Sequence, residues 1–228
     1  MNPLPPILAA NIVDDRLLYE WDEWDVHEYF DFPDEALEAQ LMTVSRRASM
    51  ALALAAGEWI CHRYSGVSAD PAPMQYLEAA WAEQMHLDTA AYVETDDDEW
   101  RGIVRGPLSL VITIANDALL CLDEDEETSI RAAWMTNLAR HVLPNADAFE
   151  RWLEAVIARL MQHHPRENEV IESMDGDVYG TGRPIARELF DTGLPVDPPA
   201  EAALIEAFLR SVDPQNPFLA KNVPDEEP

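Results

Sequence analysis

Apolar side chains recur at steps of three and four along most of this chain, which is the spacing of one face of an α-helix. The longest such stretch begins at Pro33 and ends before Gly66. A proline in the first turn, acids close behind it and a glycine beyond the end are ordinary helix start and stop signals. The apolar positions that share a face are Leu37, Leu41, Val44, Ala48, Leu52, Ala55 and Trp59. The pattern therefore predicts one long helix over residues 33–65.

The same reasoning predicts helices over residues 14–29, 70–93, 108–122, 129–144, 148–164, 185–190 and 200–212. In the segment 108–122, the β-branched run at 111–114 also suits a strand, but no partner strand is evident. Residues 94–107, with Gly102, Gly106 and Pro107, predict a linker, and residues 165–184 predict an irregular stretch. We therefore expect an all-α protein, a compact multi-helix bundle of about six to eight helices.

The helical pattern continues without a clear boundary, so residues 1–212 are expected to form a single helical domain. Residues 213–228 are rich in proline and acids, and predict an extended tail. Two sequence echoes, SRRAS at 45 with SIRAA at 129 and YLEAAWA at 76 with WLEAVIA at 152, leave open a duplicated helical hairpin. Alanine, leucine and glutamate coincide easily in helices, so the echoes alone do not decide this point.

The charge of the chain limits its partners. Of 228 residues 48% are apolar, and 44 acidic side chains stand against 15 basic ones, giving a formal charge of −29. So many apolar residues can bury a core, which excludes disorder as the default. The negative charge repels phosphate backbones, and no cluster of basic residues occurs, so we expect neither a nucleic acid nor a membrane as partner.

The lack of a visible export signal and the sparse cysteines favour a cytoplasmic protein. No Lys or Arg precedes Arg16, so the first residues lack the basic region of a secretory signal. The most apolar stretch, residues 107–122, is short for a bilayer span. Cys61 and Cys121 each lie in an apolar run, which favours reduced thiols over a disulfide or a zinc site.

Two short motifs have the composition of ligand sites. Glu83 and His86 have the Glu-x-x-His spacing of di-iron helical proteins, but such sites need a second copy and two further glutamates. Gly176–Arg183 could form a backbone nest for a phosphate, although no strand is predicted before it. No nucleophile with a base beside it is evident. We therefore expect no catalytic residue, no metal and no cofactor.

Acidic residues are concentrated in a few segments. Residues 14–38 hold eleven acids and one arginine, interleaved with aromatic rings, and two acidic runs lie at predicted helix junctions. If helices alternate in direction, these junctions lie at opposite ends of the helix between them. Aromatic rings beside carboxylates suit an interface with a basic surface. The predicted partner-binding residues are Trp21, Asp22, Glu23, Trp24, Asp25, Asp96, Asp97, Asp98, Glu99, Asp123, Glu124, Asp125, Glu126 and Glu127.

The charge pattern predicts an acidic binding protein that neutralises a basic protein partner. A bacterial immunity protein, an antitoxin against a secreted toxin such as a nuclease, has this physical character, because its carboxylates can occupy the place of the substrate's phosphates. One alternative is a helical adaptor or scaffold. A second is an enzyme with a metal or phosphate site at Glu83 and His86 or at Gly176–Arg183. The sequence leaves the oligomeric state and the identity of the partner open.

Overall fold

The computed structural model describes residues 1–86, 89–96, 99–123, 127–166, 170–173, 176–179 and 181–222. Within them the regular secondary structure is helical apart from one antiparallel hairpin, which confirms the all-α prediction. The α-helices are α1 (Pro5–Ala10), α2 (Glu35–Leu41), α3 (Arg46–Arg63), α4 (Ala72–Met85), α5 (Gly102–Leu120), α6 (Glu127–Val142), α7 (Asp147–His163) and α8 (Pro198–Ser211). The short 3-10 turns are η1 (Val26–Tyr29), η2 (Cys121–Asp123), η3 (Arg187–Phe190) and η4 (Ala220–Asn222). The hairpin pairs β1 (Val170–Ser173) with β2 (Gly176–Tyr179).

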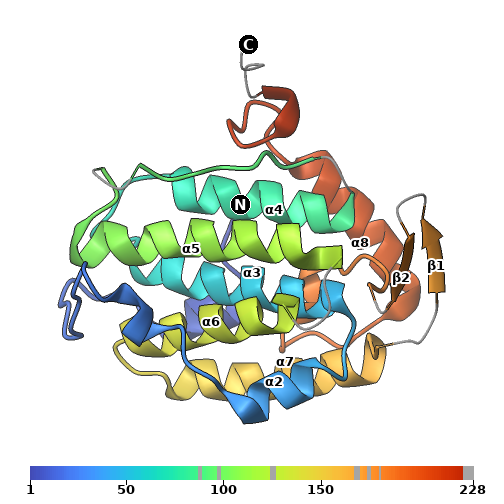
Figure 1. Cartoon of the computed structure of the whole chain (residues 1–228), viewed down its shortest axis with the longest axis horizontal. Helices are drawn as coiled ribbons and strands as arrows, with labels where there is room; N and C mark the ends of the chain where they lie inside the picture. The colour runs from blue at the N-terminus through green and yellow to red at the C-terminus, as the bar shows by residue number, and fades with distance from the viewer. Residues whose placement is uncertain are drawn as a thin grey trace.

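The central helix is α3, which is enclosed by its neighbours. Of its 18 residues 17 are buried, and it packs against α4, α5 and α6 (Figure 1). Small side chains allow the close approach, since α3 is rich in buried alanines and α6 adds Ala132, Ala133 and Ala139. A helix that is covered on all sides needs no polar face. Burial therefore extends well beyond the single face that the spacing predicts.

A buried ion pair ties the N-terminal segment and η3 to α3. The Glu58 carboxylate accepts hydrogen bonds from Arg187 Nε at 2.7 Å and from Trp81 Nε1 at 2.9 Å. Arg187 also donates to the backbone carbonyl of Asn2 at 2.6 Å. Burial raises the pKa of the Glu58 carboxyl more than Arg187 and Trp81 lower it. An ionised Glu58 therefore depends on its partners.

The single helix predicted over residues 33–65 is wrong, because α2 and α3 are separate helices. Between them Val44 pairs with Pro165 in an isolated β-bridge. Ser45 starts the new helix, since its hydroxyl oxygen accepts a hydrogen bond from the Ala48 amide at 3.2 Å. Such N-capping satisfies a backbone donor that the helix itself leaves open. A capping serine thus separates two helices although the apolar spacing continues through it.

The helix predicted over residues 14–29 is also wrong, and the chain there is irregular except for η1. Two of the apolar residues that suggested it, Leu18 and Trp24, are 75% and 92% exposed. The helix predicted over 70–93 ends at Met85, and residues 89–96 run on without helix. In residues 14–29 the three- and four-residue spacing is not accompanied by burial of one face.

Helix α5 begins inside the segment predicted to be a linker, and it contains Pro107. Among the described residues it is the one helix long and apolar enough to cross a membrane, so its length alone does not exclude a span. Half of its most apolar window is buried inside the molecule, where α5 packs against α3, α4 and α6. The buried Asn116 accepts a hydrogen bond from the Tyr76 hydroxyl at 2.8 Å.

Part of the stretch predicted to be irregular, residues 165–184, forms the hairpin, with Val170 opposite Tyr179. Residues 213–222, from the predicted extended tail, pack against α4. Asn216 Nδ2 donates to the Gln75 carbonyl at 2.8 Å, and Leu219 pairs with Ala90 in an isolated bridge. Residues 223–228 lie outside the described residues.

Candidate functional site

The acidic-aromatic loop, residues 14–32, connects α1 to α2 and lies beside the first turns of α5 (Figure 1). Seven of its carboxylates are on exposed residues: Asp15, Glu20, Asp22, Glu23, Asp25, Glu28 and Asp31. Trp24 stands among them with 92% of its surface exposed, whereas Phe30 is buried. Because the loop has little secondary structure, its position depends on side-chain anchors, and four of these can be distinguished.

The first anchor is Arg63, at the end of α3, which is only 1% exposed. Its guanidinium donates to the backbone carbonyls of Asp14 and Arg16, the latter at 2.7 Å, and to that of Val142 at 3.4 Å. A buried guanidinium needs several acceptors, and these carbonyls supply them. Arg63 therefore fixes the start of the loop to the core.

The second anchor depends on Pro107 in α5. In a helix the carbonyl of Ile103 would accept from the amide four residues later, but proline has no N–H to donate. The Tyr19 hydroxyl donates to this Ile103 carbonyl instead, and it also contacts the Tyr64 hydroxyl. The proline thus leaves open an acceptor that a residue of the loop satisfies.

The third anchor is Trp21, whose ring lies on the backbone of Gly106. A Cβ added to Gly106 would lie 2.5–2.7 Å from three atoms of the Trp21 indole, so only glycine leaves room for the ring. Trp21 also stacks on Tyr29, with centroids 5.3 Å apart, and Tyr29 stacks on His141 at 4.4 Å. This row of rings joins the middle of the loop to α5 and α6.

Replacement of Gly106 by alanine should therefore destabilise the protein by about 1–2 kcal/mol, although alanine is ordinarily the better helix residue by about 1 kcal/mol. Urea unfolding followed by circular dichroism measures the change. In a Trp21→Ala background the cost should fall to within about 0.5 kcal/mol of zero, because the ring is gone and alanine's helix preference is offset by its restriction before proline. An equal cost in both backgrounds would contradict the Trp21 anchor.

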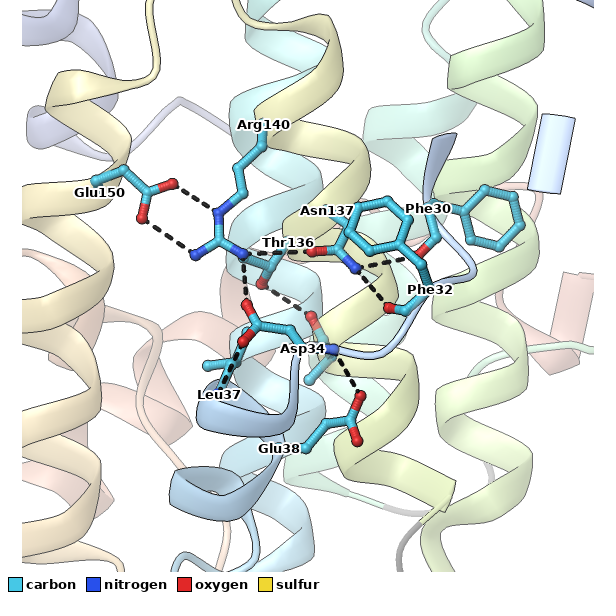
Figure 2. A network of polar contacts seen from close by, with 10 residues as sticks. Phe30, Phe32, Asp34, Leu37, Glu38, Thr136, Asn137, Arg140 and Glu150 are labelled. Atoms are coloured by element: carbon cyan, nitrogen blue, oxygen red, sulfur yellow. Dashed lines mark hydrogen bonds and ion pairs between the residues drawn. The ribbon is translucent and has the colours of Figure 1, made fainter. Parts of the chain in front are cut away.

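The fourth anchor holds the end of the loop, and Figure 2 shows it. Asn137 Nδ2, in α6, donates to the carbonyls of Phe30 and Phe32 at 3.1 Å each. Arg140 Nη1 donates to Asp34 Oδ2 at 2.7 Å, while Arg140 Nε donates to Glu150 at 2.6 Å. Burial alone would raise the pKa of the Asp34 carboxyl, but hydrogen bonds from the Leu37 amide and from Arg140 outweigh it and lower the pKa. The loop is thus fixed to α6 where it enters α2, and Arg140 links this point to α7 through Glu150.

A groove of about 290 Å³ lies between the acidic-aromatic loop and α5. Trp21, Glu23, Trp24 and Val26 line it from the loop, and Trp100, Arg101, Gly106, Ser109 and Leu110 line it from the start of α5. The structure therefore brings the predicted segment 21–25 beside Trp100 and Arg101, which follow the second predicted acidic run in the sequence. Trp100 is not among the residues predicted from the sequence, although it directly follows an acidic run. The predicted Trp21 and Trp24 likewise lie among acidic residues.

The predicted carboxylates divide between two ends of α5. Exposed Asp96 and Glu99 lie just before α5, on the side of the acidic-aromatic loop, whereas Asp123 and Glu127 follow its far end. A helix of 19 residues spans about 28 Å, so the two groups cannot form one patch. Glu127 pairs with Arg131 on its own helix. The remaining predicted residues, Asp97, Asp98, Glu124, Asp125 and Glu126, lie outside the described residues.

Glu83 and Arg183, from the two motifs with the composition of ligand sites, have partners within the protein. Glu83 Oε2 accepts hydrogen bonds from the amides of Thr89 and Ala90, at 2.5 and 2.8 Å, and so closes the turn after α4 that contains His86. Across the part of the chain that the structure describes, no three His, Cys, Asp or Glu side chains group as metal ligands. Gly176–Tyr179 is a strand, Gly180 lies outside the described residues, and Arg183 pairs with Glu201.

Fold and site together define an all-helical protein that presents an anchored acidic loop with an exposed tryptophan. The chain matches no protein-family model, no curated protein and no solved structure. Its function has therefore to be inferred from its own surface.

Proposed function

We propose that this protein binds and neutralises a basic protein partner through its acidic-aromatic loop, in the manner of an immunity protein that inhibits a toxin. The observation that carries the proposal is Trp24, which is 92% exposed and has the exposed Asp22, Glu23 and Asp25 around it. Aromatic anchors of this kind supply much of the binding energy of protein interfaces. The four anchors support this role, since they hold the loop in place while its acids and Trp24 remain in solvent.

The total charge supports the same class of partner. Solubility of a small domain needs a net charge of only about 2–8, far below the −29 of this chain. A charge of one sign speeds the capture of an oppositely charged partner by roughly 10- to 1000-fold at low salt. A toxin that acts on nucleic acid has a basic surface for phosphates, and the loop's carboxylates would occupy that surface. We therefore favour a nuclease-like toxin as the partner.

The proposal is tested by capturing the partner from the source cells and measuring its affinity for two charge-matched variants. Glu23→Gln with Asp25→Asn removes two charges from the loop, whereas Glu154→Gln with Asp197→Asn removes two exposed charges elsewhere. We expect the loop pair to weaken binding by about three- to tenfold and the control pair by less than about twofold. Equal effects would mean that overall charge, rather than this loop, attracts the partner.

Salt separates the proposal from its main alternative. The complex should weaken steadily between about 0.01 M and about 0.15 M salt, where the Debye length falls from about 30 Å to about 8 Å. A captured partner without excess basic charge, or a complex indifferent to salt, would overturn the proposal in favour of a helical adaptor with apolar contacts. A basic toxin encoded next to this protein would support the proposed class.

A further inference from the structure

We infer that the groove beside Trp24 receives an arginine side chain of the basic partner. The inference rests on the proposed function, because it specifies the chemistry of the partner at the same surface. Three features of the groove carry it: its aromatic walls, its charge, and the way this protein positions its own arginines.

The walls of the groove suit a flat cation. Trp21, Trp24 and Trp100 line it, and the indole is the best aromatic surface for cation–π contact. Trp21 is packed against Gly106 and Tyr29, which leaves Trp24, at 92% exposure, as the ring that an incoming side chain can stack on. The volume of about 290 Å³ accommodates one long side chain.

The charge around the groove favours a cation. Glu23 lines the groove. Its Oε1 is close to Gly102, since a Cβ added to that glycine would lie 3.9 Å away. Gly102 is the first residue of α5, and a carboxylate is favourable at a helix N-terminus. Exposed Asp22, Asp25 and Glu99 flank the lining residues along the chain. Among the lining residues the charge of Arg101 balances that of Glu23, and the three flanking carboxylates add negative charge around the groove.

The protein itself stacks arginine on tryptophan at two places. The Arg105 guanidinium lies 5.0 Å from the centroid of Trp100, a lining residue of the groove, and the Arg131 guanidinium lies 4.5 Å from that of Trp134. In both cases the arginine also pairs with a carboxylate, Arg105 with Asp70 and Arg131 with Glu127. Trp24 with Glu23 offers the same combination of ring and carboxylate to a partner. A planar guanidinium stacks on such a ring better than a strongly hydrated ammonium.

The test compares two synthetic peptides of equal length and charge, one alternating Gly with Arg and the other alternating Gly with Lys. Titration calorimetry gives the affinities, and the indole N–H signal of Trp24, assigned by its loss in Trp24→Ala, reports contact. We expect the wild-type protein to bind the Arg peptide about two- to fivefold more tightly, the range that an exposed cation–π contact supplies. Trp24→Ala should remove this preference, and the control Leu18→Ala, also in the loop and 75% exposed, should retain it.

The outcomes distinguish this inference from the proposed function. If both peptides bind equally, with strong salt dependence and no effect of Trp24→Ala, the arginine site is wrong while the acidic interface stands. If neither peptide binds at about 0.01 M salt, where charge attraction extends furthest, both the arginine site and the acidic interface are contradicted.

Discussion

Replacement of Arg187 by methionine should lower the free energy of unfolding by about 3–5 kcal/mol, because it leaves the Glu58 carboxylate buried without its counter-charge. Glu58 is completely buried, and the Arg187 side chain is 12% exposed, so solvent cannot replace the lost partner. The carbonyl of Asn2 loses a donor as well. Urea unfolding at neutral pH, followed by circular dichroism, measures the loss.

The matched control is Arg210→Met. Arg210 pairs with Glu206 at 3.3 Å, but both side chains are 70% exposed, so we expect a change within about 0.5 kcal/mol. A second variant, Glu58→Gln with Arg187→Met, should recover about 1–2 kcal/mol, since a neutral amide can still accept from Trp81. A loss in the double variant as large as in Arg187→Met would mean that packing, rather than uncompensated charge, dominates.

The loss in Arg187→Met should also shrink as pH falls. Burial raises the pKa of the Glu58 carboxyl above its ordinary value near 4.5, so the folded state binds this proton more tightly than the unfolded chain does. Without Arg187 the folded pKa rises further. Stability is therefore regained as the pH falls through the folded pKa toward the unfolded one. The same loss at about pH 7 and about pH 5 would contradict this account, because the lower pH lies close to the ordinary pKa of the carboxyl.

Replacement of Trp24 by alanine should weaken binding of the basic partner by about 30-fold, the equivalent of about 2 kcal/mol, with little effect on folding. The ring is 92% exposed and therefore contributes little to the core, so the free energy of unfolding should change by less than about 0.5 kcal/mol. Affinity measured by calorimetry with the captured partner, together with urea unfolding of the free protein, checks both halves of the prediction.

Leu18→Ala is the control for this substitution, because Leu18 is an exposed apolar residue of the same loop. It should weaken binding by less than about threefold, since peripheral contacts of an interface carry little energy. A similar loss for both variants would indicate a diffuse apolar contact. Unchanged affinity in Trp24→Ala would contradict the proposed function, which rests on Trp24 as the anchor of the interface.

The helices that could be predicted from the sequence are those with a clear apolar stripe. Helices α6, α7 and α8 lie within about two residues of their predicted bounds, which is the ordinary precision of helix ends. The failures have local causes. Ser45 starts α3 within an apolar spacing that is continuous in the sequence. Pro107, which suggested a linker, is tolerated in α5 because the loop supplies a donor for the Ile103 carbonyl.

The candidate site was predictable in composition but not in geometry. The aromatic rings and acids of residues 21–25 mark it in the sequence, whereas the packing of Trp21 on Gly106 joins residues 85 positions apart. Spacing within one segment carries no information on such contacts. The same holds for Arg63, whose bonds to the carbonyls of Asp14 and Arg16 fix the loop although nothing in its own helix indicates this role.

The anchors of the acidic-aromatic loop have a consequence for the entropy of association. Fixing one residue of a free segment costs roughly 1–2 kcal/mol of backbone entropy, a cost that a disordered binding loop meets when its partner arrives. In this protein the loss of backbone entropy occurs when the chain folds, because the loop is then fixed by Arg63, Tyr19, Trp21 and Asn137. Binding of the proposed partner should then cost mainly rigid-body motion and the rotamers of exposed side chains such as Trp24. We therefore expect electrostatic encounter, and not ordering of the loop, to set the rate of association.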